Sequence, residues 1–162
     1  MKKSILSVFL ISVSLISLGQ SKSYEALQSH FKGKKDVHSF KLGGILCRAA
    51  LSIATSNEPL FREMVKDIDQ VRFIVIPIEE FEKQNLSVNG FKSYLSKDSF
   101  ETLATIREDG ARVSIFHRTD SNLKDRYFVL IEERREVVAI EMKGYIDPSV
   151  LKPENTRITL EQ

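Results

Sequence analysis

Apolar residues in the first third of the chain recur at the spacing of amphipathic helices. In residues 23–32, Tyr24, Leu27 and Phe31 fall on one helical face. Residues 45–54 repeat this spacing, and their apolar face is predicted to pack on a sheet. That face consists of Leu46, Ala49, Ala50 and Ile53. We therefore expect two helices in this region, separated by a short strand.

A shorter, alternating period predicts strands in the rest of the chain. Residues 37–42 alternate in side-chain character, and residues 71–78 form a nearly continuous apolar run, which is typical of a strand covered on both faces. The C-terminal third is predicted to be a meander of antiparallel strands. Its first turn is Asp109-Gly110, because both positions of a two-residue hairpin turn need residues that tolerate positive φ.

The last strand of the meander is predicted to have one buried and one solvent-exposed face. Val138, Ile140 and Met142 would face the core, while Glu141 and Lys143 would face water. The fold class that follows is α+β. We expect a mainly antiparallel sheet that ends in a C-terminal four-strand meander, with helices packed on one face.

The first twenty residues have the pattern of a cleavable signal peptide. Lys2 and Lys3 precede an apolar stretch over residues 5–18, and small residues follow. A transmembrane anchor is the alternative, but the stretch has about 14 residues whereas a membrane span needs about 20. The predicted organisation is a signal peptide over 1–19, cleavage between Gly19 and Gln20, a single α+β domain over 20–151 and a polar C-terminal tail over 152–162.

The chain has a single cysteine, Cys47. Lipoprotein processing needs a cysteine directly after the cut, so the mature protein is predicted to carry neither a lipid nor a transmembrane anchor. A single cysteine also excludes an internal disulfide. Cys47 lies among Leu, Ala and Ile in a predicted helix, which favours a small buried hydrophobe over a nucleophile. With the leader, this pattern predicts a periplasmic or secreted protein.

The charge of the chain points to no charged partner. There are 24 basic and 22 acidic residues, and Lys2 and Lys3 of the predicted leader account for the surplus, so the rest is formally neutral. A neutral surface attracts nucleic acid or anionic lipid only weakly at long range. We therefore expect no nucleic-acid partner, which leaves an unknown envelope protein or a small ligand.

No set of residues forms a recognisable catalytic or metal-binding motif. His38 and His117 lie in predicted strands and could meet across the sheet, but they lack the short spacing of a zinc site. Glu79, Glu80 and Glu82 fit a solvated face better than a pair of carboxylates in unlike environments. We therefore predict no catalytic, metal-binding or cofactor-binding residue.

Four parts of the chain, spread over about residues 24–151, are similar to a known family. They are a helix ending in FKGKKDVHSFKL at 31–42, the small-residue helix that follows, FETLATIREDGARVSIFHR at 100–118 and VVAIEMKGYIDPSVL at 137–151. The most specific of these are ETLATIREDGARVSIF at 101–116 and GYID at 144–147. On these segments the chain resembles the domain-of-unknown-function 4252 family, small exported proteins found mostly in Bacteroidetes. The resemblance implies an α+β domain in a Gram-negative envelope, hence the periplasm, and it brings no catalytic residue. Many relatives are lipoproteins, and this chain differs by lacking a cysteine after the leader.

Three functions remain open on these observations. The first is a non-enzymatic envelope protein that binds a macromolecule or a small ligand, and the lack of catalytic groups favours it. The second is a regulatory partner in envelope stress sensing, which rests on analogy with relatives. The third is a hydrolase with an unrecognised site. An exposed apolar patch larger than a few hundred Å² would favour the binding protein, and a polar pocket with a carboxylate of raised pKa would favour the enzyme.

Overall fold

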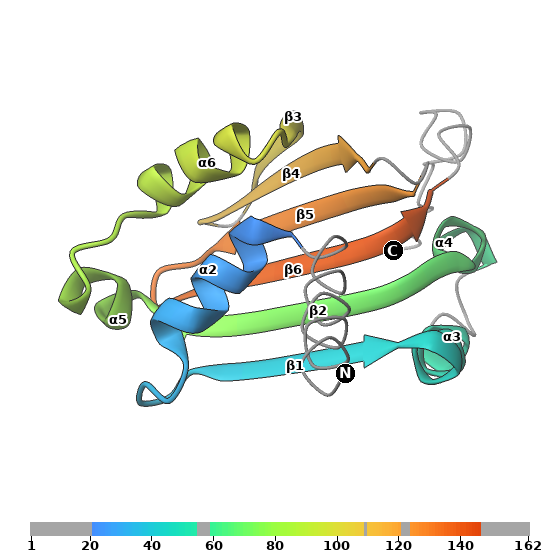
Figure 1. The fold of residues 1–162 in the computed structure, drawn as a ribbon, viewed down its shortest axis with the longest axis horizontal. Helices are drawn as coiled ribbons and strands as arrows, with labels where there is room; N and C mark the ends of the chain where they lie inside the picture. Colours follow the sequence, from blue (N-terminus) through green and yellow to red (C-terminus); the bar gives the residue numbers. More distant parts are fainter. Residues whose placement is uncertain (1–20, 55–58, 109, 121–123, 147–162) are drawn as a thin grey trace, which may run out of the picture.

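A computed structural model describes residues 21–54, 59–108, 110–120 and 124–146 and shows helices against one antiparallel sheet (Figure 1). The strands are β1 (His38–Gly43), β2 (Asp67–Pro77), β3 (Glu101–Glu108), β4 (Ala111–Thr119), β5 (Asp125–Glu132) and β6 (Glu136–Tyr145). The helices are α2 (Lys22–Phe31), α3 (Gly44–Ala54), α4 (Pro59–Val65), α5 (Ile78–Lys83) and α6 (Val88–Lys97). The six strands lie in the order β1-β2-β6-β5-β4-β3, which confirms the predicted α+β class and the C-terminal meander.

Helices α2, α5 and α6 pack on one face of the sheet, called the covered face below. As predicted, Tyr24, Leu27 and Phe31 turn inward from α2 and are almost fully buried. They share the main hydrophobic core with side chains from four strands: Ile74, Ile76, Phe116, Phe128, Leu130, Val137 and Ala139. Helix α2 begins at Ser21, whose hydroxyl accepts a hydrogen bond from the Tyr24 backbone N–H.

The predicted hairpin between β3 and β4 is confirmed. Ile106 pairs with Val113, and only two residues separate the two strands. Gly110 has a φ of +84°, a conformation that glycine adopts without a Cβ clash. Asp109, the other predicted turn residue, lies outside the described residues.

The predicted orientation of β6 is wrong. Ala139 and Glu141 face the covered side and are at most 1% exposed, whereas Val138, Ile140 and Met142 lie on the opposite face and are partly exposed. The prediction placed the carboxylate in water because an isolated buried charge is costly. An arginine of the neighbouring strand β2 pairs with this carboxylate and offsets that cost.

The predicted inner face of α3 is also wrong. Leu46 is 71% exposed and Ile53 is 76% exposed, whereas Cys47 is fully buried and Leu51 packs beside it. The helix is apolar on more than one side, so its spacing is compatible with two different inner faces. The inner side of α3 belongs to a second, smaller core cluster that consists of Cys47, Val65, Ile68, Tyr127 and Ile146.

Several predictions fall on residues that the structure does not describe. These are the signal peptide over 1–19, the cut between Gly19 and Gln20, and the polar tail over 152–162, all of which stay predictions. Across residues 21–54, 59–108, 110–120 and 124–146, no helix has both the length and the apolar character needed to cross a membrane.

Candidate functional site

The face of the sheet opposite α2, α5 and α6, called the open face below, carries apolar side chains on every strand. The smaller core cluster of α3 and α4 closes one end of it, over Leu42, Val71, Tyr127 and Met142. His117 pairs with Tyr127 at this closed end, and Glu101 pairs with His117, so both lie on the same side of the sheet. The part of the open face between the two ends of the strands consists of His38, Phe40, Phe73, Val75, Ala104, Ile106, Val113, Ile115, Val129, Ile131, Val138 and Ile140. None of these side chains is buried, and all except His38 are apolar.

Strand pairing aligns the open-face side chains in rows. Phe73, Ile140, Val129 and Ile115 form one row that runs from β2 to β4. At the β1 edge, Phe40 lies beside Phe73 with ring centroids 5.6 Å apart, and it remains 48% exposed. The rows form a continuous apolar surface, because no charged side chain interrupts them.

This surface departs from the usual design of a sheet that helices cover on one face. Such antiparallel sheets ordinarily turn polar side chains toward water on the other face. With strands about 4.8 Å apart and same-face residues about 6.7 Å apart, the open face spans roughly 400 Å² of flat sheet. This size lies within the range of the largest apolar patches on monomeric proteins, which are often functional.

The apolar run over residues 71–78 was the sequence signal for this surface. It predicted that β2 is covered on both faces, and this prediction is wrong for most of the strand. Val71 packs against the α3 cluster, but Phe73 and Val75 stay partly exposed on the open face. The run therefore indicated an apolar second face, although within the described residues only one end of it is covered.

Cys47 lies at the closed end of the open face, where it is fully buried, as predicted for a small hydrophobe. Its Sγ is 4.0 Å from the carbonyl oxygen of Ile68, to which the thiol donates a weak hydrogen bond. Burial raises the pKa of the Cys47 thiol above its ordinary value. Nucleophilic chemistry needs the thiolate, so this environment supports a packing role.

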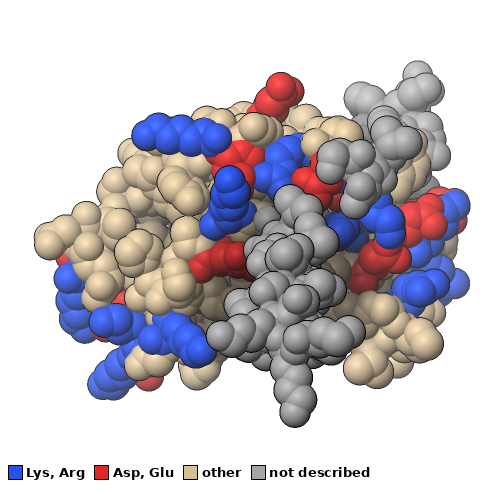
Figure 2. All heavy atoms as spheres, in the orientation of Figure 1, with Lys and Arg blue, Asp and Glu red and all other residues tan. Residues whose placement is uncertain are grey.

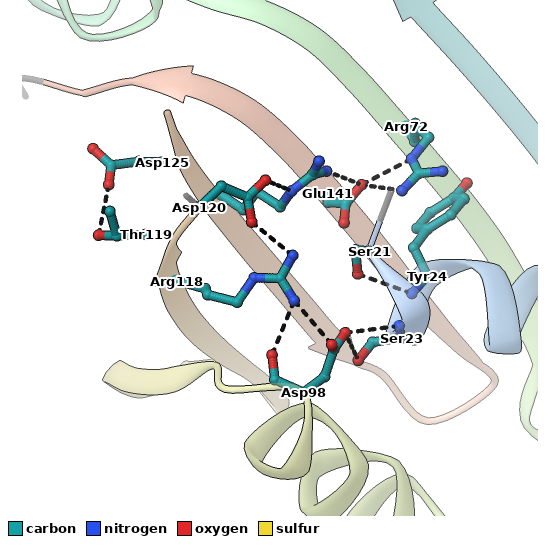
Figure 3. A network of polar contacts seen from close by, with 11 residues as sticks. Ser21, Ser23, Tyr24, Arg72, Asp98, Arg118, Thr119, Asp120, Asp125 and Glu141 are labelled. Atoms are coloured by element: carbon teal, nitrogen blue, oxygen red, sulfur yellow. Dashed lines mark hydrogen bonds and ion pairs between the residues drawn. The ribbon is translucent and has the colours of Figure 1, made fainter. Parts of the chain in front are cut away.

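A network of ion pairs lies between the covered face and α2 (Figure 3). Arg72 Nε on β2 donates to Glu141 Oε2 on β6 at 2.8 Å, and Arg126 Nη1 on β5 is 3.6 Å from the same oxygen. All three side chains are at most 4% exposed. The guanidinium carbon of Arg72 also lies 4.2 Å from the ring centroid of Tyr24. Burial raises the pKa of Tyr24 to about 12.

The network continues to the ends of α6 and α2 (Figure 3). Arg118 on β4 donates to Asp120 Oδ1 at 2.8 Å and to Asp98 Oδ1 at 2.9 Å. Asp98 follows α6, and its Oδ2 accepts from the backbone N–H and the hydroxyl of Ser23 at 2.9 and 2.7 Å. Burial raises the pKa of Asp120, but the hydrogen bonds and charges of Arg126 and Arg118 outweigh it and hold the pKa below its usual value.

The charges of this network are balanced. Three arginines of the network form ion pairs with three carboxylates. The arginines are Arg72, Arg118 and Arg126, and the carboxylates are Asp98, Asp120 and Glu141. A balanced network offers no surplus charge to a ligand, so we interpret it as a structural connection among α2, α6 and the sheet. Sequence reasoning missed it because residues in contact within it are up to 75 positions apart along the chain.

A cavity of about 440 Å³ opens between α2, α5 and α6. Its apolar lining includes Ala26, Leu27, Phe81, Leu86, Phe91 and Tyr94, and its polar groups come from His30, Asn85 and Ser87. Figure 2 shows that uncharged side chains gather over these helices and that the surface is hollowed there. The volume lies within the range of roughly 300–1,000 Å³ that is typical of small-molecule sites.

The residues considered for chemistry from the sequence do not form a site. His38 and His117 cannot meet, because β2, β6 and β5 separate their strands, and His117 Nε2 instead lies 2.9 Å from Asp125 Oδ1. Of the acidic cluster on α5, Glu80 is not solvated but only 6% exposed, and it pairs with Lys83 at 2.7 Å. Among the residues that the structure describes, no three His, Cys, Asp or Glu side chains are grouped so as to hold a metal ion.

The fold and the open face define a small α+β protein whose single sheet has helices over one face and over one end of the other. The chain matches the family described as Domain of unknown function (DUF4252) over residues 31–152, more than half of its length, and it belongs to this family. No curated protein and no solved structure matches the chain. The matched region includes all six strands, so the open face is part of the family's domain.

Proposed function

We propose that this chain is a non-enzymatic binding protein that works outside the cytoplasm and holds another protein chain against its open face. The observation that carries the proposal is the apolar, uncharged character of a sheet face that water would reach in a free monomer. Removing apolar surface from water is favourable by about 25 cal/mol per Å², so a second protein layer over this face would be stabilising.

The chemistry of the exposed and buried groups supports binding over catalysis. The middle rows of the open face consist of apolar side chains, which cannot act as acid, base or nucleophile. In the network, the arginines hold the pKa of Asp120 low, whereas a general acid working near neutral pH needs a raised pKa. Burial raises the pKa of Cys47, which opposes formation of a thiolate nucleophile.

The proposal is tested by photo-crosslinking in the cells that make the protein. A benzophenone amino acid replaces Ile140 at the centre of the open face, and a matched control replaces Ser96, which is exposed on α6. We expect a protein adduct of defined mass from position 140 and none from position 96. The captured chain is then identified, purified and titrated against this protein.

Binding of the purified captured chain must depend on side chains of the open face. Binding should be lost in Ile140→Lys and kept in Thr105→Lys, which changes an exposed position whose pairing places it on the opposite side of β3. If position 140 gave no protein adduct beyond that seen at position 96, or if Ile140→Lys bound the captured chain normally, the open face would not be a binding surface.

The cavity between α2, α5 and α6 favours a second candidate function, which is binding of a small uncharged aromatic molecule. Indole is a suitable probe, because the chain has no tryptophan and the fluorescence of indole can be followed without interference. Ala26 lines the cavity, so Ala26→Phe should abolish the fluorescence change, whereas Ser29→Phe at an exposed position of the same helix should not. Equal responses from both variants would exclude the cavity as the site.

A further inference from the structure

We infer that the occupant of the open face is a second copy of this chain, paired through a two-fold axis so that two open faces form a two-sheet sandwich. This inference rests on the proposed function, because it names the protein chain that the open face binds. It follows from the charge, the shape and the area of the open face.

The absence of charge on the open face favours a copy of the same chain. Charge complementarity is a main source of specificity for a different partner, and the middle of the open face has no Lys, Arg, Asp or Glu. Charged residues that pairing places on this side stand at the ends of the strands, as Glu101, Asp125 and Glu136 do. A two-fold interface places the same patch on both sides, so it must be complementary to itself. An uncharged apolar face meets this condition without opposing like charges. The whole chain has a formal net charge of only +2, so copies repel one another weakly.

The shape of the open face determines how two copies can approach. Twisted sheets pack face to face about 10 Å apart with their strands rotated by about 30°. Because α3 and α4 occupy one end of the open face, a second copy must leave that end free. A two-fold axis that lies between the two sheets, parallel to their planes and perpendicular to the strands, satisfies this condition. It places the helices α3 and α4 of the two copies at opposite ends of the sandwich. Helix α3, on which Leu46 and Ile53 are exposed, then lies at the free end of the partner's sheet.

The area of the open face predicts the strength of the pair. Two copies contribute roughly 800 Å² of flat sheet, which is below the roughly 1,200 Å² of stable interfaces, so side-chain relief and α3 must supply the remaining area. We therefore expect a dimer with a Kd on the order of micromolar. Such a pair forms at the concentrations used for sedimentation and dissociates on dilution.

Sedimentation analysis of the purified protein over a dilution series tests the inference. Ile140→Lys sets a charge at the centre of the interface and should weaken the dimer by about a hundredfold or more. Phe40→Lys places a charge in the interface at the β1 edge. Because the Phe40 side chain is already 48% exposed, a lysine there should change the stability of the monomer little. Thr105→Lys adds the same charge to the opposite side of β3 and should leave the dimer unchanged.

The outcomes separate this inference from the proposed function. A monomer at all concentrations up to about a hundred times the expected Kd would overturn the dimer, as would a dimer that persists in both Ile140→Lys and Phe40→Lys. If the crosslink at position 140 then captures a different protein, the proposed function stands and only the identity of the occupant is wrong. If position 140 captures nothing, both fail. If Ile140→Lys does not fold, as circular dichroism would show, Phe40→Lys alone decides.

Discussion

Arg72 and Glu141 face each other on neighbouring strands, and the guanidinium Nε donates to the carboxylate at 2.8 Å while both side chains are almost completely buried. The two residues are 69 positions apart in the chain. Their pairing brings β2 from the first half of the sequence against β6 at its end, in the middle of the sheet.

Removing one member of this pair should be much more damaging than removing both. Glu141→Leu leaves Arg72 buried without its carboxylate and is expected to lower the free energy of unfolding by about 3–5 kcal/mol. The double variant Arg72→Leu with Glu141→Leu should recover most of this loss, because Arg72 is no longer left unpaired and Arg126 keeps its ion pair with Asp120. Urea unfolding of the wild type, Glu141→Leu, Arg72→Leu and the double variant measures the coupling. Equal destabilisation by the single and double variants would show that the pair is not coupled.

Asp120 should make stability depend on acidity. Arg126 and Arg118 outweigh the effect of burial and hold the pKa of Asp120 below that of the unfolded chain. The stability that results is present above the unfolded value of about 3.9 and is lost as the pH falls through the lower folded value. Urea midpoints between pH 2 and 7 should therefore fall less steeply in acid for Asp120→Asn than for the wild type. Asp36→Asn, at an exposed position, is the control and should follow the wild-type profile.

Gly144 should tolerate a side chain less well than Gly110, although both have positive φ. A Cβ at Gly144 would lie 2.2 Å from the backbone oxygen of Asp67, whereas a Cβ at Gly110 would meet nothing closer than 3.9 Å. Gly110→Ala is expected to cost about 1 kcal/mol from conformation alone. Gly144→Ala should cost about 3 kcal/mol or more, because the backbone of β2 must also move. Thermal unfolding compares the two, and equal losses would contradict the close approach.

Cys47 should be unreactive while the protein is folded. It is fully buried and its pKa is raised by burial, so both access and thiolate formation oppose labelling. Reaction with an alkylating reagent should proceed no faster than local or global opening, and Cys47→Ala should cost about 1 kcal/mol, as for a small cavity. Labelling of the native thiol at the rate of the urea-unfolded chain would disprove the assignment.

The sequence predicted the elements of this fold more successfully than the faces of those elements. The positions of α2 and the β3–β4 hairpin followed from spacing and turn residues, which are local properties. The orientation of β6 did not, because Val138 and Ile140 on one side are as apolar as Val137 and Ala139 on the other. The usual rule that a carboxylate points to water then selected the wrong face. The residues near Glu141 in the sequence do not reveal that Arg72 on β2 pairs with it.

The candidate site was predictable only in part. The apolar run over residues 71–78 indicated that both faces of β2 are apolar, but the strand order that assembles the open face is not encoded in any local pattern. The same strand order separates His38 from His117, which excluded the one metal site considered. The cavity and the ion-pair network join helices and strands distant in sequence, so spacing gave no signal for either.

The central position of β6 has a consequence for the order in which the chain folds. β6 is the last strand of the meander in sequence, ending at Tyr145, yet it is the strand that pairs with β2 and so joins β1 and β2 to the meander. Until it has been synthesised, the two halves of the sheet have no strand in common, and neither has its complete core. Closing a loop of some 70 residues also costs entropy before the contacts form, which slows folding. A chain that is still being made therefore cannot close its sheet before β6 has been synthesised.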